Sequence, residues 1–163
     1  MKSSLKTILA AGLTAGTLDL TLAIVYFGIT LHAPFTAVPQ SVASGVLGPR
    51  AYRLGIPAAL LGIFLHYFIA LTLADFYYAA SLRIPFLNRQ PILSGAAYGV
   101  AVYLVMQHIV LPLSRHPAPR NFGTPWRIAN IASHIFFIGI AIALITRHYS
   151  IPAPSTAPST SGE

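Results

Sequence analysis

The prolines of this chain confine where long helices can run. The sequence has 163 residues, and thirteen of them are proline. All thirteen lie outside four windows, which are 1–33, 58–84, 92–111 and 126–151. Proline lacks a backbone donor and clashes with the preceding turn, so uninterrupted helices fit only inside these windows. Each window is close to the ~20 residues that a helix needs to cross ~30 Å of hydrocarbon.

The windows are also strongly apolar, which predicts helices that span a membrane. Hydrophobic residues make up 55% of the chain and charged residues 8%, whereas a soluble domain carries about 25% charged residues. Lipid leaves no water to satisfy an open backbone, so we predict an all-α, four-helix transmembrane bundle. The predicted spans are 7–31, 56–80, 92–113 and 127–147. They form one domain over residues 1–148, followed by a disordered tail at 149–163 that is rich in Pro, Ser and Thr.

The amino terminus permits a second interpretation. Lys2 and Lys6 followed by an apolar run are typical of a signal peptide. The run continues to Leu31, which is too long for the apolar region of such a peptide, and Asp19 interrupts it. We therefore expect the first span to be retained.

The charge pattern favours lipid over nucleic acid as a partner. The net charge is +7, but the ten Lys and Arg residues are scattered between apolar stretches, which is typical of loops beside anionic headgroups. The chain has no cysteine, which excludes disulfides and thiolate chemistry. It also lacks serine-hydrolase, zinc-protease and phosphate-loop motifs, so we expect neither an enzyme nor a cofactor. The sequence leaves open whether the protein has a small-molecule or ion substrate and whether it forms a homo-oligomer.

The basic residues leave the orientation of the bundle nearly balanced. Five of them fall on the side of the termini and five on the side of the 32–55 loop. The amino terminus adds one positive charge to the first side, which favours cytoplasmic termini under the positive-inside rule.

Two connections between the predicted spans have features of their own. The 32–55 segment is long for a loop, and its middle is small and apolar. It is a short interfacial helix, a re-entrant segment or a plain loop. The 114–126 loop carries Arg115, Arg120 and Trp126, which suit a position among lipid headgroups. We expect His116, in the same proline-rich loop, to be solvated.

Small residues at helical spacing predict where the helices meet. One face of the first span is small and polar, and its members are Gly12, Gly16, Asp19, Ala23, Tyr26 and Thr30. Small residues allow helices to approach closely in lipid, so this face should point into the bundle. We predict further packing positions at Gly62 in the second span and at Gly95 and Gly99 in the third.

Polar residues inside the predicted spans are expected to share one middle layer. Four side chains lie roughly 10–18 Å from the end that bears the 32–55 loop, at ~1.5 Å per residue; they are Asp19, His66, Tyr103 and His134. Asn130 lies one turn from His134 on the same helix face. A carboxylate beside imidazoles at mid-depth is typical of a proton relay, because histidine titrates near neutral pH.

This central polar layer has three interpretations. Polar side chains join helices in lipid at ~0.6 kcal/mol on average, and this structural role, in a membrane protein of unassigned activity, is the main hypothesis. The runner-up is a proton-linked transporter or channel that uses Asp19 with His66 and His134. A two-histidine, one-carboxylate metal site is the third, but no two of these ligands have the i, i+4 spacing, and we predict no metal. A lipid-acting enzyme has the least support, for lack of a motif.

Asp75 lies near the end of the second span, on the opposite helix face from His66. It falls on the same side of the membrane as Arg83 and Arg89, so we predict a snorkelling ion pair with one of them. Tyr77 and Tyr78 are expected to lie at the lipid interface.

Five segments recur in the order found in a known group of membrane proteins. They are GLTAGTLD at 12–19, QSVASGVLG at 40–48, GIFLHYFIAL at 62–71, YGVAVY at 98–103 and LPLS at 111–114. The chain thereby resembles small four-span bacterial inner-membrane proteins, distantly similar to YagU-like proteins of unknown function. The resemblance covers about residues 8–147 and implies a cytoplasmic-membrane location without an activity. It puts emphasis on Asp19, the 40–48 segment, His66 and Tyr103.

Overall fold

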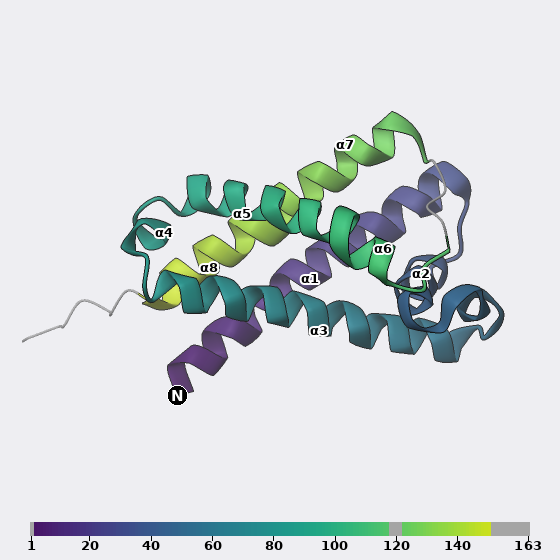
Figure 1. Cartoon of the computed structure of the whole chain (residues 1–163), viewed down its shortest axis with the longest axis horizontal. Coiled ribbons are helices and arrows are strands. Elements are labelled where there is room, and N and C mark those ends of the chain that lie inside the picture. Colours follow the sequence, from purple (N-terminus) through teal and green to yellow (C-terminus); the bar gives the residue numbers. More distant parts are fainter. Residues whose placement is uncertain (1, 118–121, 151–163) are drawn as a thin grey trace, which may run out of the picture.

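The computed structural model describes residues 2–117 and 122–150, which fold into an all-α four-helix bundle, as predicted (Figure 1). The first two long helices are α1 (Lys2–Leu31) and α3 (Ile56–Ser81). The third is continuous through α5 (Pro91–Val105), the π-helical η2 (Met106–Val110) and α6 (Leu111–Leu113). The fourth runs through α7 (Gly123–Ser133), the π-helical η3 (His134–Ile140) and α8 (Ala141–Ser150). The described residues contain no strand, and all four helices are long and apolar enough to cross a membrane.

The predicted spans lie inside these four helices, and the ends differ by a few residues. The second and third helices agree with prediction to within one residue, whereas the first begins before residue 7 and the fourth extends over 123–150. Tyr149 and Ser150, which belong to the predicted tail at 149–163, are part of α8. The remainder of that predicted tail, 151–163, lies outside the described residues.

The long connection after α1 is helical. It contains α2 (Ala37–Leu47) and the 3₁₀ helix η1 (Gly48–Arg53), at the end of the bundle where α1 joins α3 (Figure 1). His32 adopts a left-handed backbone conformation, with a φ of 51°, and breaks the helix just before the chain reaches Pro34. Gly48 and Gly55 also have positive φ values of 62°, which suits glycine where the chain turns into and out of η1.

Glycine residues lie where α1 crosses α3. A Cβ atom added to Gly12 would come 2.8 Å from the Leu71 Cα, and one added to Gly16 would come 3.0 Å from the Ala70 Cβ. Gly62 packs so closely on α2 that its Cβ would overlap the carbonyl group of Pro39. The glycines of these two helices therefore set how closely the backbones approach.

A second glycine crossing joins α5 to η3. Gly95 and Gly99 on α5 face Gly139 on η3, and each would overlap neighbouring backbone if it carried a side chain. An added Cβ would come 2.8 Å from the Ile140 Cα at Gly95 and 2.7 Å from the Ile135 Cα at Gly99. All five predicted packing glycines thus lie at close helix contacts in the structure.

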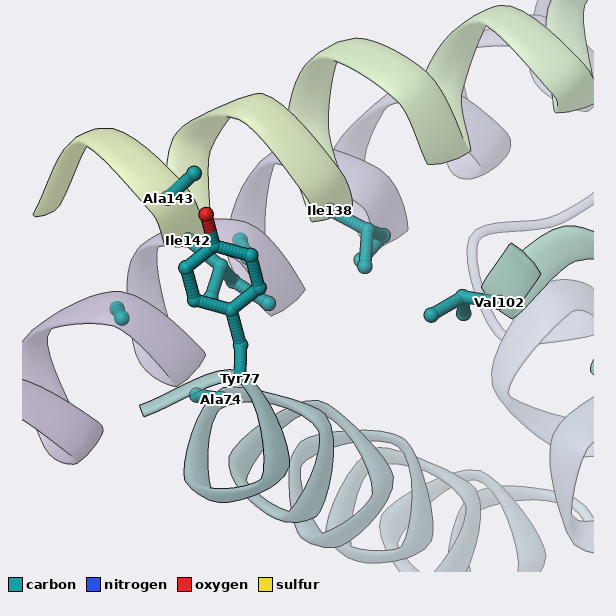
Figure 2. Close-up of a cluster of buried hydrophobic side chains, with 8 residues drawn as sticks. Ala74, Tyr77, Val102, Ile138, Ile142 and Ala143 are labelled. Atoms are coloured by element: carbon teal, nitrogen blue, oxygen red, sulfur yellow. The ribbon is translucent and has the colours of Figure 1, made fainter. Parts of the chain in front are cut away.

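Figure 2 shows the core, a cluster of buried hydrophobic side chains. Its buried members come from all four long helices and are Ala11, Ala15, Ala74, Tyr77, Val102, Ile138, Ile142 and Ala143. Tyr77 extends from α3 toward α8, near Ile142 and Ala143 (Figure 2). It is only 2% exposed, so its expected position at the lipid interface is wrong. Its hydroxyl lies 2.9 Å from the Ser94 hydroxyl and donates to the Leu87 carbonyl at 3.3 Å, since a buried phenol needs polar partners.

Pro112 explains why the third helix changes its pitch. Proline has no N–H with which to continue the α-helical ladder, and its ring crowds the carbonyl one turn earlier. The backbone widens to a π-helix over Met106–Val110, where the Leu111 N–H reaches back to the Met106 carbonyl. The predicted third span survives because the wider turn keeps the other backbone groups paired.

Candidate functional site

The single carboxylate of the central polar layer is bonded to a serine. The Ser133 hydroxyl donates to the Asp19 Oδ1 atom and so joins the end of α7 to α1. Ser133 is 4% exposed, and Asp19 is half-buried. A buried carboxylate without a partner is costly, and this contact stabilises it while tying together helices that lie 114 positions apart in the sequence.

His66 binds the backbone of α1 one turn away from Asp19. Its Nε2 atom lies 2.9 Å from the Gly16 carbonyl oxygen. A carbonyl oxygen only accepts hydrogen bonds, so Nε2 carries the proton and donates. The missing side chain at Gly16 leaves this carbonyl accessible, because the α3 helix can approach closely there. The glycine crossing and the histidine contact therefore reinforce each other.

His134 begins the π-helical segment η3 and makes a contact within its own helix. Its Nδ1 atom donates to the Asn130 carbonyl oxygen at 2.9 Å. The Tyr103 ring on α5 meets the His134 ring edge-on, with centroids 5.6 Å apart. Asn130 contributes its backbone to this cluster, and Tyr103 contributes its ring.

The five predicted residues of the central polar layer are therefore divided between separate contacts. Asp19 bonds Ser133 and neither histidine, and the two histidines donate to backbone carbonyls. Within residues 2–117 and 122–150, no three His, Cys, Asp or Glu side chains are grouped so that they could hold a metal ion. The structure thus joins these residues to neighbouring helices without linking them into one chain of titratable groups.

An apolar cleft lies beside the Asp19–Ser133 contact. It has a volume of about 250 Å³ and is lined by Leu22, Ala129, Ala132, Ser133, Phe136 and Phe137. Ser133 is its one polar lining residue, and the hydroxyl of that serine already donates to Asp19. A cleft with this lining suits hydrocarbon better than water or ions.

The ion pair predicted for Asp75 is not formed. Asp75 is exposed, and among the described side chains it pairs with neither Arg83 nor Arg89. For Arg89 the reason is the position of α4 (Pro85–Arg89), whose Leu87 carbonyl accepts from Tyr77. Tyr77 lies two residues after Asp75, and two residues turn a helix by about 200°, so α4 packs on the side that Asp75 faces away from.

A second polar contact, outside the apolar helices, holds the segment after α6 against α2. The Arg115 N–H donates to the Gly45 carbonyl at 2.8 Å, and the His116 Nδ1 lies 3.0 Å from the Ser44 hydroxyl. Ser44 donates its only proton to the Ser41 carbonyl at 2.6 Å, so His116 must donate to Ser44. His116 is half-buried and bonded to Ser44, so it is less solvated than expected.

This position affects the titration of His116. Burial lowers the pKa of His116 below its ordinary value of 6.5, because desolvation disfavours the charged imidazolium. The unfolded chain then binds a proton at a higher pH than the folded chain. The stability that this residue contributes is therefore fully present above pH 6.5 and is lost as the pH falls through the lower, folded pKa.

Sequence reasoning missed the two serines that complete these contacts. Ser133 precedes His134, and Ser44 lies in the 40–48 segment, yet neither was singled out because serine is common in helices and loops. Both are nearly inaccessible, at 4% and 0% exposure. A small polar residue inside an otherwise apolar helix was the one available signal for Ser133.

Comparisons of this chain with protein-family models, with curated proteins and with solved structures find no match. The resemblance to YagU-like membrane proteins therefore stays a prediction.

Proposed function

We propose that this chain is a small multi-pass protein of a bacterial cytoplasmic membrane, and that its central polar residues hold the helices together. The observation that carries the proposal is the apolar outer surface of all four long helices. Leu13, Phe64, Ile92 and Phe136, one from each helix, are 45%, 64%, 64% and 59% exposed. Water would disfavour so much exposed apolar surface, whereas lipid would not.

The small buried fraction of each helix also supports lipid as the medium around the protein. The most apolar 18-residue windows of the four helices are 28%, 22%, 11% and 28% buried inside the protein. Most of the apolar residues therefore face outward, and packing between the helices cannot account for the composition. A membrane-spanning chain requires this distribution because its exterior must be as apolar as its surroundings.

The geometry of the polar layer supports a structural role over proton transport. Each of these hydrogen bonds either joins two helices or stabilises one helix. Asp19 is bonded to Ser133, and His66 is bonded to the Gly16 backbone. A relay would need Asp19 and the histidines in one hydrogen-bonded chain or along one water-filled path, and the cleft beside Asp19 is lined by apolar side chains.

The orientation belongs to the same proposal. We place both termini in the cytoplasm, because the side of the bundle that carries them has one more positive charge than the other side. A reporter fused after residue 150 tests this placement. A fluorescent protein there should fluoresce and a secreted phosphatase there should stay inactive, and the reverse pattern would overturn the orientation.

Removing Ser133 separates the structural role from the transport role. Ser133→Ala should lower the free energy of unfolding in lipid by about 1 kcal/mol, because polar contacts between membrane helices contribute ~0.6 kcal/mol on average and ~1.7 at most. Thr21→Ala is the matched control, since Thr21 is an exposed hydroxyl on α1 with no hydrogen bond in the described part of the chain.

The accompanying measurement is proton flux into vesicles that contain a pH-sensitive dye. The proposal expects the wild-type chain and Asp19→Asn to match protein-free vesicles. A pH-driven flux in the wild type that Asp19→Asn abolishes, with the variant still folded, would overturn the structural role in favour of transport.

A further inference from the structure

The outer face of the α1–α3 pair carries two opposite charges. Lys6 on α1 and Asp75 on α3 are both exposed. Neither forms an ion pair with any side chain that the structure describes. If these helices lie in lipid, as proposed above, Asp75 faces a medium in which an unpaired charge is costly, and Lys6 lies one turn inside the start of α1, at the boundary of that medium. Asp75 has only one methylene group between its carboxylate and the backbone, so it cannot snorkel far toward water.

The two charges lie on the same side of the helix pair. On α1, the exposed residues Lys6, Leu13 and Thr17 follow steps of seven and four, which places them on one face. On α3, Asp75 lies eight residues after Tyr67, which is about 80° further round the helix, and it points away from the buried Tyr77 two residues on. The Thr17 and Tyr67 hydroxyls lie 2.8 Å apart, so these two faces adjoin and form one outer surface.

The opposite side of the pair is already covered. Ala11 and Ala15 on α1 and Ala74 on α3 are completely buried, and they pack in the cluster that also contains Ile142 and Ala143 of α8. The outer surface of α1 and α3 is therefore the side of the pair that α8 leaves uncovered.

The two charges also lie at nearly the same depth. The helices run antiparallel and cross where Gly12 meets Leu71. Asp75 is four residues beyond Leu71, or about 6 Å, and Lys6 is six residues before Gly12, or about 9 Å. Both displacements point to the end of the bundle that carries the amino terminus (Figure 1), so the depths differ by about 3 Å.

We propose that a second copy of this chain packs on the outer surface of α1 and α3, related by a two-fold axis along the membrane normal. Lys6 of each copy then pairs with Asp75 of the other, so the dimer contains two reciprocal ion pairs. A two-fold interface brings each residue of a pair opposite its counterpart. One cation and one anion at nearly equal depth on one face are self-complementary under that symmetry, whereas an anionic lipid headgroup would satisfy Lys6 but not Asp75.

Charge reversal in the full-length protein tests this dimer. The assay counts photobleaching steps of labelled chains in liposomes across a range of protein-to-lipid ratios. Asp75→Lys and Lys6→Asp should each raise the dissociation constant at least tenfold, because each places like charges together. The double variant, which exchanges the two charges, should return to within about threefold of the wild type. Arg83→Asp, an exposed reversal at the same end of the bundle, serves as the control and should leave the dimer intact.

A second measurement needs no change of charge. The chain has no native cysteine, so a single cysteine at Leu13 reports directly on the proposed surface. Leu13→Cys should form a disulfide-linked dimer in liposomes, and Leu93→Cys, exposed on α5, should not. A wild-type chain that stays monomeric at every protein-to-lipid ratio, or a folded double variant that fails to recover the dimer, would overturn this inference. Those results would leave the membrane proposal standing, whereas a chain that fails to insert into liposomes would remove both.

Discussion

Replacing Gly99 by alanine should destabilise the bundle, although the same substitution ordinarily stabilises a helix. In a helix interior, Gly→Ala contributes about 0.5–1 kcal/mol through reduced backbone entropy. At Gly99, however, the new methyl group would come 2.7 Å from the Ile135 Cα and 2.8 Å from the His134 carbonyl carbon. These atoms are backbone, so no side-chain rotation can relieve the overlap, and α5 and η3 must separate.

The structure sets the sign and size of this effect. Overpacking of a tight contact costs about 1–3 kcal/mol. The atoms around Gly99 are backbone and cannot move aside, so the cost of overpacking there should lie near the upper value. After subtracting the helix contribution, Gly99→Ala should cost about 2 kcal/mol, roughly a 30-fold change in the ratio of folded to unfolded protein. Gly28→Ala is the matched control, because Gly28 lies in α1 with nothing within 4 Å of an added Cβ. That variant should be stabilised by about 0.5–1 kcal/mol.

Both variants can be measured by reversible unfolding in mixed micelles. Trp126 is the only tryptophan of the chain, and it packs against Phe27 with ring centroids 4.4 Å apart, so its fluorescence reports on the contact between α7 and α1. Far-ultraviolet circular dichroism reports on the helices independently. Equal or greater stability of Gly99→Ala, or a loss at Gly28→Ala of the same size, would refute the reasoning from close glycine contacts.

Three further predictions follow from polar and packing contacts. Tyr77→Phe should cost about 1 kcal/mol in the same unfolding assay, because its buried hydrogen bonds are lost. Gly62→Ala should displace α2 from α3 and increase proteolytic cleavage within 37–53, since its methyl group overlaps the Pro39 carbonyl; unchanged cleavage would contradict this. The unfolding midpoint should fall between pH 7.5 and pH 5.5, as the depressed pKa of His116 requires. In His116→Asn the fall should be smaller, and an equal fall would assign it to other groups.

The positions of the helices could be predicted from the sequence because they depend on local chemistry. Proline cannot continue a helix, and apolar windows of this length need internally satisfied backbones. The glycine contacts were also predictable, since Gly12 and Gly16 share a face with the same spacing as Gly95 and Gly99. In each case the controlling physics lies within one or two turns of a single helix.

The polar pairings could not be predicted because they depend on how whole helices rotate against one another. Asp19 bonds Ser133 instead of the adjacent His134, and one residue turns a helix by about 100°. The rotation of α7 about its own axis therefore decides which of the two side chains reaches the carboxylate. Tyr77 and Asp75 depended in the same way on which side of α3 the short helix α4 covers.

Cysteine accessibility in sealed vesicles tests the claim that lipid surrounds the four helices most directly. The chain has no cysteine to remove, so single cysteines can be placed at Phe68, in the middle of α3, and at Tyr52, in η1, both of which are exposed in the structure. A membrane-impermeant maleimide should label position 52, either in intact vesicles or once the vesicles have been opened. Position 68 should stay unlabelled until detergent or denaturant is added. Equally rapid labelling of both positions in intact or opened vesicles would show that water reaches α3, which would contradict the membrane-spanning bundle.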